Sequence, residues 1–207
     1  MKMKALTSTL AIAALALGAV GVAQAADSKY VVKLGVAGVV PKSDNGYLAN
    51  GLFKTDVGNS VRPSITFEYM VTPNIGIEVL GAWPFRNDIK LNGAKLARVD
   101  VLPPTVSLQY HFLPDNVVSP FVGAGLNYTF IYKEKTMGAI RNYKLDVKNS
   151  FGLAAHVGVD FNFNKNWLMT LDARWIQMRS DVKIEGVKEG KVKIDPIVWG
   201  IAVGYRF

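Results

Sequence analysis

Cysteine is absent from the 207 residues, histidine occurs only twice, and charged residues make up only 19% of the chain. The missing cysteine excludes disulfide bonds and thiol chemistry, so the fold must be stable without covalent cross-links. After residue 25, no stretch approaches the roughly 18 to 20 consecutive apolar residues that a membrane-spanning helix needs. Yet half of the residues are hydrophobic and 11% are aromatic, which excludes a disordered chain. The composition therefore suits a membrane, while the helical pattern is missing.

The first 25 residues have the organisation of a secretory signal. Lys2 and Lys4 supply positive charge, an apolar run rich in Ala and Leu covers residues 6–22, and Ala23-Gln24-Ala25 is a small-x-small cleavage site. Because no stop signal flanks this site, cleavage is favoured over a retained N-terminal anchor. We expect residues 1–25 to be a signal peptide and residues 26–207 to form one exported domain.

Eight segments of the mature chain place an apolar residue at every second position, which is the period of a β-strand. The other face of these segments is rich in Gly and Ala, which suits the crowded interior of a small barrel. The apolar face carries no charge, and its aromatic residues gather near the two ends. A soluble sandwich would turn its apolar face inward and expose a strongly polar one, so two aromatic girdles around an uncharged band favour a barrel in a bilayer. The eight segments cover residues 30–37, 65–70, 75–83, 105–112, 122–130, 152–163, 167–176 and 197–207.

The charge lies mainly in four long connections, residues 41–63, 84–103, 131–150 and 179–196. Without Lys2 and Lys4, 22 basic and 16 acidic residues remain, and 17 of the basic and ten of the acidic residues lie in these connections. Short turns join the other strands, as the periplasmic turns of outer-membrane barrels do. We therefore predict an all-β, eight-stranded antiparallel transmembrane β-barrel of the up-and-down type, with both termini periplasmic and four long extracellular loops.

The basic character of these connections indicates a partner. Their net charge of +7 suits contact with the anionic lipopolysaccharide surface of an outer membrane. The basic residues are mixed with acidic ones rather than clustered on one element, so we expect no nucleic-acid binding.

Strand direction assigns a depth to each residue of the inward face. Unpaired buried charge is costly, so the carboxylates there should pair with cations, and the forked donors of Arg174 and Arg206 should serve several of them. This network either plugs and rigidifies the barrel or handles a solute. The apolar set either binds a hydrophobic ligand or packs against folded-in loops. The apolar candidates, toward the extracellular end, are Val39, Leu80, Ala82, Ile176, Met178 and Val198. The charged candidates, lower in the lumen, are Lys33, Glu68, Glu78, His156, Asp160, Asp172, Arg174 and Arg206.

The two histidines do not indicate catalysis. A barrel enzyme acting on outer-leaflet substrates would need a His beside a nucleophile or carboxylate near the outer surface. His111 abuts a periplasmic turn, and His156 sits in mid-lumen without a serine on the same strand face. No metal-ligand spacing, phosphate loop or nucleotide fingerprint is present. We expect no catalytic residue, no cofactor and no metal, and we do not expect an enzyme.

Several segments together resemble the outer membrane protein W (OmpW) family, and they lie in the family's order over nearly all of the mature chain. The resemblance implies an outer-membrane barrel with a narrow hydrophobic channel that takes up small hydrophobic compounds, with sideways release into the bilayer as one route. The alternative is a structural or receptor barrel with a plugged lumen and no transport. The terminal Phe207 resembles the signal that such barrels present to their assembly machinery. The matching segments are Leu102-Pro103-Pro104-Thr105 with 108–112, 120–129, 74–79, Trp83-Pro84-Phe85, Asp195-Pro196 and 204–207.

Overall fold

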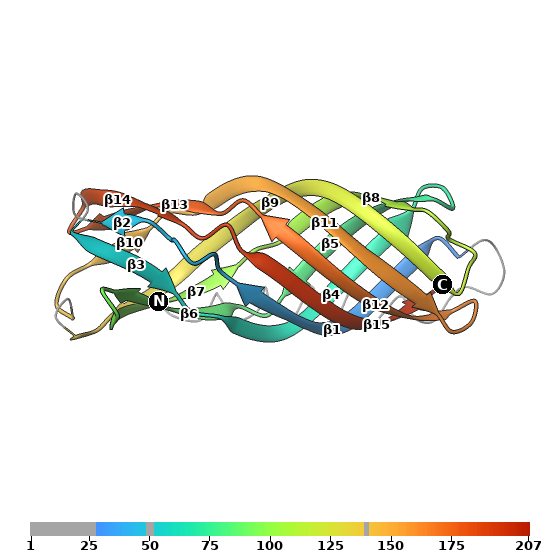
Figure 1. Cartoon of the computed structure of the whole chain (residues 1–207), viewed down its shortest axis with the longest axis horizontal. Coiled ribbons are helices and arrows are strands. Elements are labelled where there is room, and N and C mark those ends of the chain that lie inside the picture. Colours follow the sequence, from blue (N-terminus) through green and yellow to red (C-terminus); the bar gives the residue numbers. More distant parts are fainter. Residues whose placement is uncertain (1–27, 49–51, 139–140) are drawn as a thin grey trace, which may run out of the picture.

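The computed structural model describes residues 28–48, 52–138 and 141–207, and in these residues the regular structure is almost entirely β-strand (Figure 1). The proposed signal peptide lies outside the described residues. In the described part of the chain, no helix is long and apolar enough to cross a membrane.

Eight antiparallel strands close into a barrel, as the alternating segments predict. Each of the eight strands except the last pairs with the barrel strand that follows it in the chain. The first strand, β1, also pairs with the last, β15, over ten positions, from Val31 with Arg206 to Val40 with Ile197, so no edge is left open. Closure satisfies the backbone hydrogen bonds that a bilayer interior cannot. The strands are β1 (Tyr30–Val40), β4 (Ser60–Met70), β5 (Ile75–Ala82), β8 (Thr105–His111), β9 (Val118–Thr136), β11 (Ser150–Asn162), β12 (Trp167–Ile176) and β15 (Ile197–Arg206).

The barrel wall buries its polar face and exposes its apolar face. On β1 the side chain of Lys33 is 2% exposed, while that of Leu34, its neighbour, is 60% exposed. The same holds on β8, where Gln109 is buried and Leu108 is 58% exposed. This arrangement is the reverse of a soluble protein, and only a lipid environment makes it favourable.

Aromatic side chains bound the exposed apolar band at both ends. At the end where the chain terminates, the ring centroids of Tyr30 and Phe207 lie 5.9 Å apart, and those of Trp167 and Tyr205 lie 5.0 Å apart. At the other end, the rings of Tyr128 and Phe130 lie 4.7 Å apart. The two predicted girdles are therefore present as clusters of contacting rings.

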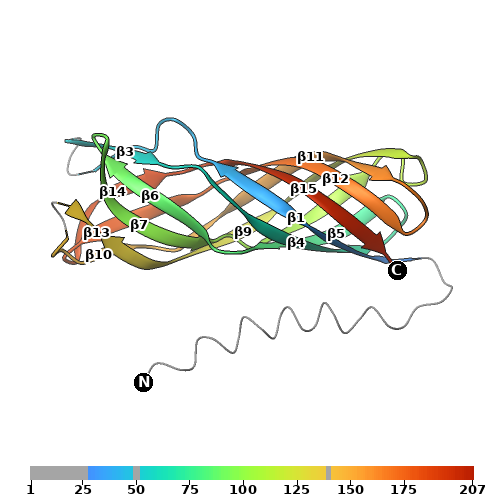
Figure 2. The same ribbon diagram turned by 90° about the horizontal axis from the view of Figure 1, so that it is seen from below.

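The four long connections are present as predicted, and much of their length is regular structure. In the described residues they contain seven further strands that continue the barrel wall beyond the band, at the left of Figure 1, whereas the C-terminus and the short turns lie at the right. Figure 2 shows the same extension from below. We call these two ends the extended end and the short-turn end. The additional strands are β2 (Tyr47–Leu48), β3 (Phe53–Val57), β6 (Phe85–Leu91), β7 (Ala94–Leu102), β10 (Leu145–Val147), β13 (Arg179–Ile184) and β14 (Val187–Lys193).

In the extension the strands place apolar side chains inward and polar side chains outward, which is the opposite of the band. On β6, Phe85 and Asn87 are buried while Arg86 between them is exposed, and on β13 the apolar Val182 is buried between two charged neighbours. Outside the bilayer, the outward face meets water and accepts charge, whereas the inward face packs as an ordinary apolar core. The extension is thus built like a soluble barrel on top of a membrane barrel.

Side-chain amides hold the junction between the two parts, where Pro41, Pro84, Pro103-Pro104 and Pro196 interrupt strands. Prolines remove ladder donors, so other groups must complete the hydrogen bonding. The buried amide of Asn127 donates to the carbonyl oxygens of Pro103 (3.1 Å) and Pro104 (3.0 Å). These contacts close the wall where β7 ends and β8 begins.

Candidate functional site

A buried polar cluster occupies the middle of the barrel lumen. It is assembled from strands β1, β4, β5, β8, β11 and β12, so it draws on most of the wall. Its members are Lys33, Glu68, Glu78, Gln109, His111, His156, Asp160, Thr170, Asp172 and Arg174.

Lys33 and Glu68 centre the half of the cluster nearer the short-turn end. Lys33 Nζ lies 3.2 Å from Glu68 Oε2 and 3.4 Å from Asp160 Oδ1. His111 Nε2 lies 2.7 Å from Glu68 Oε1, and the hydroxyl of Thr170 donates to Asp160 Oδ1 at 2.5 Å. Each carboxylate therefore has a charged or hydroxyl partner, as burial demands.

Gln109 joins this half to the next. Its amide nitrogen donates to Glu68 Oε1 (3.0 Å) and to Glu78 Oε2 (3.1 Å). Its oxygen lies 3.0 Å from His156 Nε2. Both hydrogens of the Gln109 amide nitrogen are donated to carboxylates, so the Gln109 oxygen accepts a hydrogen bond from His156. The hydrogen of the His156 ring therefore lies on Nε2.

Arg174 closes the cluster across the lumen. Its Nη2 contacts Glu78 Oε1 at 2.5 Å, and its Nη1 donates to Ser107 at 3.3 Å. Strands β12 and β5 stand four places apart in the eight-stranded ring, so the Arg174–Glu78 pair spans the full width of the barrel. At this level the lumen is crossed by an ion pair.

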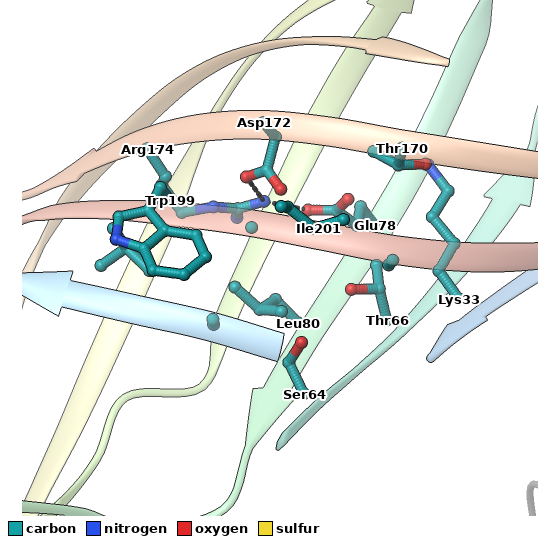
Figure 3. Close-up of a pocket in the computed structure, with 14 residues that line it drawn as sticks. Lys33, Ser64, Thr66, Glu78, Leu80, Thr170, Asp172, Arg174, Trp199 and Ile201 are labelled. Atoms are coloured by element: carbon teal, nitrogen blue, oxygen red, sulfur yellow. Dashed lines mark hydrogen bonds and ion pairs between the residues drawn. The ribbon is translucent and has the colours of Figure 1, made fainter. Parts of the chain in front are cut away.

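A small cavity lined by both polar and apolar residues adjoins this pair (Figure 3). In Figure 3, the side chains of Asp172, Glu78 and Arg174 point toward one another, and Asp172 Oδ2 lies 4.0 Å from Arg174 Nη2. Leu80 lies on the wall of the same cavity.

The structure brings most of the predicted charge network together. Arg206 is the exception: its Nη2 lies 3.4 Å from Asn162 Oδ1, and within the described residues it forms no ion pair with an acid. It is the next-to-last residue, at the short-turn end of the barrel and beyond the reach of the cluster. The prediction that Arg206 pairs with several carboxylates was therefore wrong.

Three members were missing from the predicted network although they share its face. Gln109 and His111 are buried on the inward face of β8, and Thr170 lies two positions before Asp172 on the inward face of β12. Phe121 is a further inward residue, 2% exposed, and Lys33 Nζ lies 5.3 Å from its ring centroid. The period of two would have identified Gln109, His111 and Thr170, because each lies on the inward face of a predicted segment. Phe121 lies one residue before the segment predicted over residues 122–130.

Above the polar cluster, the lumen becomes apolar. Val39, Ile176, Met178 and Val198 belong to one continuous buried cluster, and Ala82 packs against it. The cluster continues into the extension with Leu48, Phe85, Val99, Val101, Ile131, Val147, Val182, Val192 and Ile194, among others. Five of the six predicted apolar residues therefore meet here, and folded-in strands cover them.

A small apolar cavity lies within the extension. Strands β2, β6, β7, β10, β13 and β14 all contribute to its wall, so it sits inside the ring that they form. The wall consists only of apolar side chains: Leu48, Ile89, Leu96, Ala97, Leu145, Val182, Ile184 and Val192.

The described residues contain no group of three or more His, Cys, Asp or Glu side chains arranged to hold a metal ion. Cations and hydrogen-bond donors hold the lumen carboxylates instead.

Comparison with known proteins agrees with this architecture. The OmpW family model matches residues 26–207. Outer membrane protein W of Vibrio cholerae is 34% identical over 196 residues, which cover 87% of this chain and 89% of the relative. The crystal structure of OprG from Pseudomonas aeruginosa superposes with a TM-score of 0.77 at 27% identity, covering 87% of this chain and 96% of OprG.

A more distant relative carries a metabolic name. The dibenzothiophene metabolism operon protein PahQ of Pseudomonas aeruginosa is 29% identical over 120 residues, or 56% of each chain. The family match covers residues 26–207, and the fold is that of solved outer-membrane barrels. The chain therefore belongs to the OmpW family and is a β-barrel protein of the outer membrane.

Proposed function

We propose that this barrel takes up small hydrophobic compounds through an apolar path that begins in its extension. The observation that carries the proposal is the cavity lined only by apolar side chains inside the extension, continuous with the apolar cluster below it. A relative named for dibenzothiophene metabolism supports the solute class, since dibenzothiophene is an apolar aromatic compound.

The proposal includes an orientation and a route. The short-turn end faces the periplasm, so the extended end meets the outside and its cavity receives the solute first. An apolar solute moving straight down the axis would have to displace the Arg174–Glu78 pair, at a large cost in desolvated charge. We therefore place the exit on the lipid side of the wall, above the polar cluster.

Export and assembly complete the proposal. Residues 1–25 direct export and are removed. Phe207, whose ring stacks on Tyr30 and Tyr205 at the short-turn end, is recognised by the barrel assembly machinery. Lipopolysaccharide surrounds the extended end. The proposal assigns no catalytic residue and no cofactor.

A second candidate is a structural or receptor barrel without transport. It is favoured by the polar cluster, which fills the lumen from β1 to β12 with paired groups. In that case the apolar cavity would be an unused packing defect, and filling it would leave cellular uptake unchanged.

Filling the cavity separates the two functions. Ala97 is 2% exposed and lines the cavity, so Ala97→Trp should occupy the space without adding charge. We expect the initial rate of dibenzothiophene uptake by cells to fall about tenfold or more, because the indole ring occupies the space through which the solute would pass. Ala94→Trp, at an exposed position of the same strand, should leave uptake unchanged.

Both variants must first be shown to migrate on gels as folded, heat-modifiable protein in the outer-membrane fraction. With equal amounts of folded protein, equal uptake by the Ala97→Trp variant and the parent would favour the structural barrel.

A further inference from the structure

The outer face of the extension carries a carboxylate placed between two exposed cations. Asp100 of β7 pairs across the sheet with Arg86 of β6 and Tyr132 of β9. Its side-chain oxygens lie 3.7 Å from Arg86 Nε and 3.5 Å from Lys133 Nζ. We call Arg86, Asp100 and Lys133 the Asp100 triad.

All three side chains of the triad point away from the lumen. Val99 and Val101 are buried on either side of Asp100, and Phe85 is buried beside Arg86. Lys133 has a φ of +54°, in the left-handed region, where the strand departs from regular pairing. This irregular backbone keeps Lys133 on the outer face, with its Nζ 5.5 Å from the ring centroid of Tyr132.

The geometry leaves the cations available for a second anion. The Asp100 side chain is only 9% exposed, but those of Arg86 and Lys133 are 65% and 71% exposed. The triad has a net charge of +1, and most of the guanidinium and ammonium donors face solvent. A covered carboxylate that holds two exposed cations side by side pre-organises them and lowers the entropy cost of binding.

The surrounding face adds positive charge. Asp88 lies between Lys95 Nζ (2.5 Å) and Arg98 Nε (2.8 Å) on the same pair of strands. Partial burial alone would raise the pKa of Asp88, but the hydrogen bonds and charges of Arg98 and Lys95 lower it below its ordinary value. The acids on this face are therefore occupied internally, and an approaching molecule meets mainly cations.

The triad lies at the height of lipid headgroups. Trp83 and Phe130, which are 57% and 43% exposed, belong to the aromatic girdle, and each stands three residues before a cation of the triad. Three residues of strand span about 10 Å along the chain, and less along the tilted barrel axis. The headgroup layer above the hydrocarbon is about 5–7 Å thick. The cations therefore stand within or just above this layer.

We propose that the Asp100 triad binds a phosphate group of lipid A in the surrounding lipopolysaccharide. Lipid A carries its phosphates at the headgroup level of the outer leaflet, and the neighbouring girdle residues contact its acyl chains. The Arg86 guanidinium supplies a forked pair of donors and the Lys133 ammonium supplies a point charge, which together suit a phosphate. This inference rests on the proposed orientation of the barrel and is independent of solute uptake.

The test compares lipid binding by the full mature chain and two charge-matched variants in detergent. In Arg86→Gln with Lys133→Gln, the triad loses both cations. In Lys29→Gln with Lys165→Gln, two exposed lysines at the short-turn end are lost instead. Binding of bisphosphorylated lipid A, of lipid A without phosphates and of phosphatidylglycerol is measured by native mass spectrometry.

We expect the triad variant to bind bisphosphorylated lipid A about tenfold or more weakly than the parent, because it loses the charge-assisted hydrogen bonds to the phosphate. The short-turn variant should bind like the parent, and lipid A without phosphates should bind weakly to all three proteins. Equal binding by the triad variant, an equal loss in the short-turn variant, or tighter binding of phosphatidylglycerol would overturn the proposal. A loss confined to the short-turn variant would overturn the orientation as well. Uptake by the Ala97→Trp variant is measured separately, so failure of either proposal is recognisable.

Discussion

Single glycines make room for the polar side chains of the lumen. A Cβ atom on Gly123 of β9 would overlap the His156 ring, and one on Gly76 of β5 would overlap the carboxylate of Glu68. The lumen of an eight-stranded barrel is only wide enough for its side chains to fill. Long polar residues can therefore meet there only if their neighbours have no side chain.

This requirement predicts opposite effects at two glycines of the wall. Gly123→Ala should destabilise the barrel by about 1–3 kcal/mol, because the added methyl group displaces His156 from Gln109. Gly81→Ala should be neutral or stabilise by about 0.5–1 kcal/mol, since a Cβ there meets Ile65 at an ordinary 3.7 Å and alanine loses less backbone entropy. Urea unfolding in lipid vesicles measures both, and equal losses at the two positions would contradict this account.

Residue type and parity predicted which side chains face the lumen, but not all of their partners. Lys33, Glu68, Glu78 and Arg174 meet as the cost of unpaired charge requires. Arg206 has the same parity and charge, yet it bonds to Asn162. The difference is its height along the axis, which depends on strand tilt and register and cannot be read from alternation.

At the scale of strands, the inverted alternation explains why the sequence did not predict strands within the four long connections. The membrane strands were recognised by an uncharged, apolar outer face. A segment with a charged residue at every second position lacks that face and was therefore interpreted as a polar connection. In β13 and β14 the same pattern places Val182 and Val192 inward and lysines outward. Charge is tolerated there because the outer face is in water, so strands continue where the membrane ends.

The buried Asn45, which lies just before β2, joins strands β3 and β14 of the extension through its side chain. Its Oδ1 accepts from the Val57 backbone nitrogen (2.9 Å), and its Nδ2 donates to the Lys193 carbonyl (3.1 Å). Asn45→Ala should cost about 1–3 kcal/mol locally, because the Val57 amide and the Lys193 carbonyl lose their partners.

Amide hydrogen exchange followed by NMR measures this local effect. Exchange at Val57 should accelerate, while exchange at Leu34 in the barrel stays unchanged, since strands open in separate units. Asn59→Ala, at an exposed position between β3 and β4, is the matched control. Unchanged exchange at Val57 would show that Asn45 does not hold the extension.

At the scale of the whole molecule, the Arg174–Glu78 pair braces opposite walls of the barrel. Arg174→Met alone should destabilise the protein by about 3–5 kcal/mol, because it leaves the Glu78 carboxylate buried without its cation. Combining it with Glu78→Leu should restore most of the loss, since two apolar side chains leave no unpaired charge. The free energy of unfolding in urea gives the coupling energy of the pair.

A distant exposed residue provides the control for this measurement of coupling energy. Lys148 is exposed and pairs with Asp146 in the extension, far from the lumen cluster. Lys148→Met combined with Arg174→Met should show additive losses. A coupling energy for Arg174 and Lys148 similar to that for Arg174 and Glu78 would indicate that the measurement reports global destabilisation rather than the contact across the lumen.

The sequence by itself determined the eight alternating segments, the lipid-facing and lumen-facing sides and the uncharged band, because a period of two and the cost of charge in lipid are local properties of the chain. Only the tertiary structure decided that the barrel continues into an extension and which lumen groups meet. Arg174 and Glu78 are 96 positions apart, and Gln109 joins groups from three strands. Such contacts depend on closure, tilt and register, which arise only when all eight strands are paired.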